Sequence, residues 1–169
     1  MQQASCPFRW VRVSLVVGLL GLSACGDSTP QDRAGAPGRT PLFDHLGTLH
    51  HPITTTSPLA QQYFDQGLRL VFAFNHEEAI ASFEEAARLD PRAAMPYWGI
   101  ALALGPNINA PMDQQQEKRA YEAVKKAREL SSHVSEPEQV YINALAVRYS
   151  IAFDAKRRPL DAVYADVMR

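Results

Sequence analysis

Residues 63–91 carry small and aromatic side chains at the spacings expected for two packed helices. The residues that set this pattern are Tyr63, Gly67, Ala79, Phe83, Ala86 and Pro91. Glycine lets a partner helix approach closely, the two alanines leave room on the near face of the second helix, and the aromatic side chain fills the space between them. Proline can begin the next helix because its missing N–H would have no partner there. The stretch predicts a helix–turn–helix unit that packs against others.

This pattern resembles the tetratricopeptide repeat (TPR), a helix–turn–helix unit of about 34 residues. A narrower resemblance, to bacterial TPR proteins of unassigned activity, covers about residues 42–169. It rests on residues 46–53, 64–68, 74–79 and 97–109. The resemblance implies an all-α fold, a TPR α-solenoid of about three helix-turn-helix pairs. Members are typically longer than this chain, so we expect it to be the N-terminal part of a longer solenoid or the product of a truncated gene.

A second unit can be placed by register. The spacing of Ala79, Phe83 and Ala86 returns at Ala120, Val124 and Ala127, an offset of 41 residues. That is seven more than the usual period of about 34 residues. The surplus equals the length of residues 105–111, which we interpret as an insertion between the two helices of the second unit.

Helix start signals divide the chain from residue 58 onward into three pairs, at about 58–91, 92–132 and 135–169. Ser57 before Pro58 is an N-cap signal, and Ser135 begins a capping box with Glu138. The expected helices cover about residues 58–74, 77–89, 92–104, 114–130, 135–151 and 160–168. We also expect a Glu84–Arg88 pair on the water-facing side of the second helix.

The last expected helix ends in the middle of its apolar pattern. In a complete array the next repeat would cover its outer side. We therefore expect apolar surface to be open at Val147, Tyr164 and Met168.

Residues 1–25 have the features of a bacterial lipoprotein signal peptide. Arg9 and Arg12 precede an apolar run of ten residues, too short to span a bilayer, which takes roughly 20 residues. The run leads into Leu-Ser-Ala-Cys, which resembles a lipobox. The resemblance implies that Cys25 is lipidated and becomes the first mature residue. The mature chain would then be anchored to the membrane and not span it.

Composition and charge limit the possibilities for the mature chain. Residues 26–41 hold almost no apolar side chain larger than alanine and are expected to form a disordered tether. An extended segment, 42–57, comes next. Removing Arg9 and Arg12 from 17 basic residues leaves 15 against 18 acidic ones, a net charge of about −3. This charge disfavours nucleic acid as a partner. We expect the protein to lie in the cell envelope and to face the periplasm. The outer membrane is favoured over the inner membrane as the site of its anchor.

Four histidines are the only candidates for metal chemistry: His45, His50, His51 and His76. Imidazole suits zinc or copper. Their spacing matches no defined ligand motif, so turn-packing or solvated histidines are the favoured interpretation. A metal-binding or metal-dependent envelope protein remains the alternative hypothesis.

The favoured hypothesis is a non-catalytic, lipid-anchored scaffold that binds a protein or peptide. We read no activated nucleophile, paired-carboxylate site or phosphate loop in the sequence, and no cofactor is expected. Candidate partner-binding residues are Phe64, Leu68 and Trp98, on the helices that line the concave surface of the family, and Asn107 and Asn109 in the insertion. Most of the apolar ones should be core. Any of these apolar side chains that are exposed would form a surface suited to binding an apolar peptide or the chain's own residues 42–53.

Overall fold

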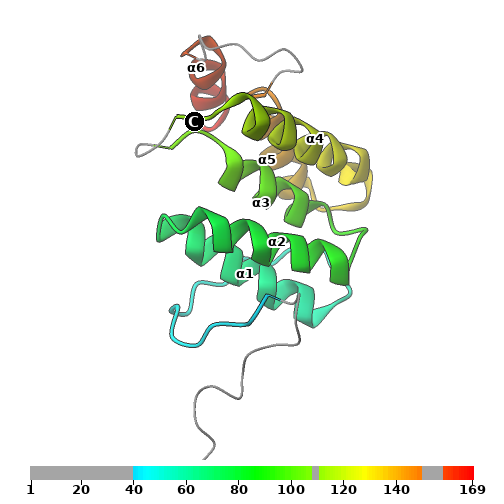
Figure 1. The fold of residues 1–169 in the computed structure, drawn as a ribbon. Coiled ribbons are helices and arrows are strands. Elements are labelled where there is room, and N and C mark those ends of the chain that lie inside the picture. The colour runs from blue at the N-terminus through cyan, green and yellow to red at the C-terminus, as the bar shows by residue number, and fades with distance from the viewer. Residues whose placement is uncertain (1–39, 108–110, 150–157) are drawn as a thin grey trace, which may run out of the picture. The chain divides into compact units, whose positions relative to one another are not determined.

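The computed structural model describes residues 40–107, 111–149 and 158–169 (Figure 1). These residues form α-helices and one short 3-10 helix, and they contain no β-strand. The elements are α1 (Pro58–Phe72), α2 (His76–Leu89), α3 (Ala94–Leu104), α4 (Gln114–Leu130), η2 (Ser131–His133), α5 (Glu136–Ala146) and α6 (Arg158–Val167). The predicted all-α fold is confirmed. Within the described residues, no helix is long and apolar enough to cross a bilayer.

The predicted starts of α1 and α5 are confirmed by their caps. The Ser57 hydroxyl accepts a hydrogen bond from the amide of Ala60 at 3.2 Å, with Pro58 in the first turn. Ser135 and Glu138 form the expected capping box at the start of α5. A capping box between Asp113 and Gln116 begins α4. These side chains satisfy amides that the first turn of a helix leaves without partners.

Four helices differ from their expected bounds by two residues or more, among them α6, which begins at Arg158 instead of near residue 160. α1 ends at Phe72, two residues early, because Phe74 takes a left-handed conformation with φ 59°. The amide of Asn75 then bonds the carbonyl of Leu70 at 2.9 Å, which closes the helix end. α3 begins at Ala94, two residues later than expected. The fifth helix ends at Ala146 instead of near residue 151.

The core follows the predicted small-residue pattern. The side chains of Ala79, Phe83, Ala86, Ala120, Val124 and Ala127 are all at most 2 % exposed. Each helix packs on its neighbours in sequence from α1 to α5, and α3 also contacts α1 and α5. Figure 1 shows α1 to α4 lying roughly side by side. The α2–α4 register match therefore reflects two helices that bury equivalent faces.

The Phe83 ring lies against two glycines. A Cβ atom at Gly67 in α1 would fall 2.6 Å from Cε1 of Phe83, and a Cβ at Gly99 in α3 would fall at the same distance. The Phe64 ring lies 5.5 Å away, centroid to centroid. The predicted close approach at Gly67 is confirmed, and Gly99 plays the same part from the other side.

One predicted surface pair is wrong. Arg88 bonds Glu85, three residues before it, at 2.7 Å. Glu84 instead approaches Arg119 of α4 at 3.4 Å. Glu85 is itself buried, so the guanidinium sits where it can neutralise the less solvated of the two carboxylates.

The outer side of the last described helices is partly open, as expected. Val147 is 36 % exposed and Met168 45 % exposed. Tyr164 is more covered than expected, because the guanidinium of Arg148 lies 5.0 Å from its ring centroid. Arg148 also bonds Asp161 at 2.9 Å and so links α6 to the end of α5.

Candidate functional site

Side chains of the helical part bind residues 40–57, mainly through backbone atoms. We call residues 40–57 the extended segment; it includes Thr40 and Pro41 in addition to the predicted 42–57. The five residues that do most of this are Gln61, Asp65, Gln66, Asp90 and Glu138, which we call the clamp residues. Four of them are at most 9 % exposed (Asp65, Gln66, Asp90 and Glu138). A buried polar side chain is costly unless its hydrogen bonds are made. Here the extended segment supplies many of them.

Asp65 and Gln61 hold the middle of the extended segment against α1. The Asp65 carboxylate accepts from the amide of His51 at 3.0 Å and lies 2.7 Å from Nδ1 of His50. Gln61 accepts from the amide of Ile53 and donates to the carbonyl of His51, both at 2.9 Å. The two side chains are four residues apart and so lie on one face of the helix.

Gln66 holds the beginning of the extended segment. It accepts from the amide of Phe43 at 2.7 Å and donates to the carbonyl of Pro41 at 2.9 Å. Tyr63 donates to the carbonyl of Thr40 at 2.8 Å. Thr40 and Pro41, expected at the end of the disordered tether, are therefore bound to α1. The rest of that tether, 26–39, and the expected lipidation site Cys25 lie outside the described residues.

Glu138 links the extended segment to α5, 84 residues further along the chain. One carboxylate oxygen accepts from the amide of Thr54 at 2.8 Å and the other from its hydroxyl at 2.5 Å. The same carboxylate completes the α5 cap with Ser135. Burial raises the pKa of Glu138, but the bonds from Ser135 and Thr54 outweigh it and leave the pKa below its usual value.

Asp90, between α2 and α3, holds the end of the extended segment. Its carboxylate accepts from the hydroxyl of Thr55 at 2.6 Å and from the amides of Thr56 and Arg92 at 3.2 Å. The Thr55 bond is the main cause that lowers the pKa of Asp90, against the opposing effect of burial. The carboxylate therefore stays ionised, and in that form it is the stronger acceptor.

Two pockets flank the extended segment where it crosses from α1 to α5, and both include Thr54. One, of about 430 Å³, is lined by residues 54–56 with Asp90, Arg92, Leu130 and His133. The other, of about 440 Å³, is lined by residues 51–54 with Ser135, Pro137, Glu138 and Tyr141. Together we call them the Thr54 pockets. They combine exposed apolar walls with an arginine and hydroxyl groups, a composition suited to polypeptide.

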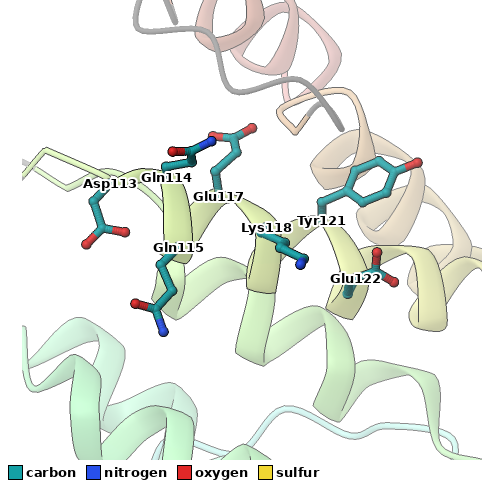
Figure 2. Close-up of a pocket in the computed structure, with 7 residues that line it drawn as sticks. All are labelled: Asp113, Gln114, Gln115, Glu117, Lys118, Tyr121 and Glu122. Atoms are coloured by element: carbon teal, nitrogen blue, oxygen red, sulfur yellow. The ribbon is translucent and has the colours of Figure 1, made fainter.

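A third pocket lies elsewhere, along the first turns of α4. It measures about 590 Å³ and is lined by residues 113–122 alone. Figure 2 shows its seven side chains fanning out in several directions from this one stretch of helix. Since they do not converge on one point, they do not form a catalytic arrangement.

The predicted apolar partner-binding residues lie mainly in the core. Phe64 is fully buried, Leu68 is 7 % exposed and Trp98 is 9 % exposed. The indole N–H of Trp98 donates to the carbonyl of Tyr141 at 3.1 Å, which fixes the ring between α3 and α5. A partner could reach these side chains only if they were uncovered first. Asn107 is half-buried, and Asn109 lies outside the described residues.

The four histidine side chains lie in four different environments. His50 contacts Asp65, and His51 packs between the rings of Phe64 and Tyr141, with centroids at 6.2 and 6.0 Å. His45 is exposed at a tight turn with φ 68°. Both ring nitrogens of His76 are shielded from solvent and have no hydrogen-bond partner among the described residues. No group of three metal-binding side chains occurs in the part of the chain that the structure describes.

Sequence reasoning missed the clamp residues. Asp65 and Gln66 interrupt the apolar run of α1, and this was the available signal, because polar side chains on a helix face that should be buried need a partner. Their partners could not be identified, because Asp65 and Gln66 bind the amides of His51 and Phe43, which lie 14 and 23 residues earlier in the sequence.

Comparison with known proteins gives no assignment: no family model matches the sequence, and neither the curated proteins nor the solved structures contain a match. Any statement of function must therefore come from the chain itself.

Proposed function

We propose that this chain is a non-catalytic, lipid-anchored scaffold of the TPR type that binds a protein or peptide at the bacterial cell envelope. The observation that carries the proposal is the binding of the extended segment. Side chains of the helical part bind five backbone amides and four backbone carbonyls of that segment. Backbone contacts of this kind hold an extended chain whatever its side chains are.

The arrangement of helices supports a repeat solenoid. Phe83 of α2 packs between equivalent glycines of α1 and α3, which are the first helices of the first two expected units. α1, α3 and α5 contact one another in order, as first helices do in stacked pairs. The extended segment crosses this set of helices from Asp65 on α1 to Glu138 on α5.

A partner would bind in the Thr54 pockets, next to the extended segment and, like it, as extended polypeptide. Tyr141 is 36 % exposed on the wall of one pocket, and Arg92 and His133 are exposed at the other. Aromatic and arginine side chains at a partly open surface are enriched where polypeptides bind. The clamp carboxylates already accept hydrogen bonds from the fold, which makes them poor candidates for general bases.

The test is site-specific photo-cross-linking in intact bacterial cells. A benzoylphenylalanine side chain would replace Tyr141 in one strain and Glu122, an exposed α4 residue, in a matched control. We expect a discrete adduct with an envelope protein from position 141 that is absent from position 122. Equal adducts at both positions, or none at position 141 in protein that fractionates with membranes, would contradict a partner site at the Thr54 pockets.

A further inference from the structure

The turn between α1 and α2 presents large apolar side chains to solvent. Phe72 is 67 % exposed and Phe74 is 58 % exposed. Leu49 is 43 % exposed, and its carbonyl accepts from Arg69, one turn before Phe72, at 2.8 Å. We call Leu49, Phe72 and Phe74 the apolar knuckle. Aromatic side chains left this open at one point of a fold mark a binding surface.

The backbone of the knuckle is held in an unusual conformation. Phe74 has φ 59°, a left-handed value that bulky residues rarely adopt. Asn75, which adopts this conformation more readily, is the next residue. A helix end of this kind needs only one left-handed residue, and here that residue is the one whose ring points outward. Backbone strain of this sort is concentrated at functional positions.

The knuckle is bordered by the start of α2, where Asn75 and Glu77 are exposed. His76 follows at the start of α2, and both its ring nitrogens are shielded. The edge of one ring faces the other, with the His76 and Phe74 centroids 6.2 Å apart. The next carboxylates in sequence, Glu77 and Glu78, lie in the first turn of α2. These carboxylates limit the apolar surface to the aromatic side chains of the turn. The knuckle could therefore insert only to a shallow depth into whatever it binds.

The described chain begins at Thr40, which lies on α1 and α2: its carbonyl accepts from Tyr63 and its hydroxyl donates to the carbonyl of Ala81. The amide of Phe43 bonds Gln66, six residues before Phe72, or about 9 Å along the axis of α1. Leu42 and Phe43 are themselves 42 and 41 % exposed. Fourteen residues, 26–39, separate this region from Cys25. Even fully extended they span only about 50 Å, so an anchor at Cys25 would keep the helical domain within that distance of a bilayer.

We infer that the apolar knuckle inserts into the interfacial region of the lipid bilayer to which the chain is anchored. This inference rests on the proposed anchor at Cys25. The interface accommodates aromatic and aliphatic side chains at a shallow depth. The mature chain has a net charge of about −3, so the contact is apolar and does not depend on attraction to anionic lipid. This contact determines which end of the helical domain faces the membrane.

The test uses the processed, lipidated chain in vesicles of phosphatidylethanolamine and phosphatidylglycerol. The sequence has only two cysteines, Cys6 in the expected signal peptide and Cys25, so an Ala73→Cys variant carries one free thiol for an environment-sensitive fluorophore. The control label is at Val140→Cys, a position that is 55 % exposed on α5. Brominated phosphatidylcholine serves as the quencher in both samples.

We expect a blue-shifted emission at position 73 that brominated lipid quenches, unchanged at high salt, and a water-like emission at position 140. Adding Phe72→Ser and Phe74→Ser should abolish the shift while the chain still floats with the vesicles. Water-like emission at position 73 in protein that floats with the vesicles would overturn the insertion of the knuckle into the bilayer but would leave the proposed anchor intact. A chain that does not float would overturn both. A shift seen only in native envelope membranes would assign the knuckle to a protein partner and overturn the bilayer contact.

Discussion

The contact of Phe83 with two glycines makes a sharp prediction about Gly99→Ala. The new Cβ would lie 2.6 Å from the Phe83 ring atoms Cδ1 and Cε1, closer than real Cβ atoms come to their neighbours. The ring is fully buried and cannot move away. Overpacking of this kind costs about 1–3 kcal/mol. Against it stands the better helix propensity of alanine, worth about 1 kcal/mol in the middle of α3. The net change should be destabilising.

The sign should reverse when the ring is removed. Phe83→Ala alone should cost roughly 3–5 kcal/mol, since it opens a cavity at a fully buried site. In that background the Cβ at residue 99 has space, so Gly99→Ala should be neutral or stabilising by up to about 1 kcal/mol. The expected coupling between the two sites lies within the roughly 0.5–3 kcal/mol found for residues in contact.

Urea unfolding followed by circular dichroism at 222 nm would measure all four proteins of the cycle. Sucrose would be present throughout, because excluded osmolytes keep a weakened variant folded. The same cycle with Gly67→Ala provides a matched comparison from the α1 side of the ring. An equal cost of Gly99→Ala with and without the Phe83 ring would refute the packing argument.

The anchor, the acid limit of stability and the last helix each allow a shorter test. Cys25→Ser should release the protein from the membrane fraction and block signal cleavage; unchanged membrane association would contradict the anchor. Because the folded-state pKa values of Asp90 and Glu138 are lowered, their stabilisation is present above the unfolded values of about 4 and is lost as the pH falls through the lower folded values. The urea midpoint should drop there, and Thr55→Val should flatten that drop; an identical pH profile would count against the Asp90 bond. Arg148→Ala should speed hydrogen exchange in α6 but not in α2, and unchanged exchange in α6 would show that this side chain does not hold the helix.

The helices and their buried faces could be predicted because each depends on residues near in sequence. Ser57 and Ser135 cap the helices that follow them, and the two small-residue patterns bury the faces expected of them. The ends were less predictable. α1 stops two residues early because Phe74 takes a left-handed conformation, and aromatic residues give no sequence signal for that.

The candidate site could be predicted only in part. The sequence indicated that residues 42–57 are extended and that the chain's own N-terminal part could lie on the helices. It did not reveal that Glu138 and Asp90 would hold that part, because such contacts join residues 84 and 35 positions apart. Trp98 looked available for a partner, but its ring is fixed by the carbonyl of Tyr141. A pattern on one helix does not show what a distant segment covers.

Amide hydrogen exchange across the extended segment tests most directly whether these helices bind extended polypeptide. Residue-resolved exchange by nuclear magnetic resonance should show slowed exchange at the amides of Phe43, His51, Ile53, Thr54 and Thr56, each of which donates to a clamp residue. In Glu138→Ala the protection at Thr54 should fall most, with α2 unchanged. Exchange at all five amides as fast as in an unstructured peptide would contradict the account.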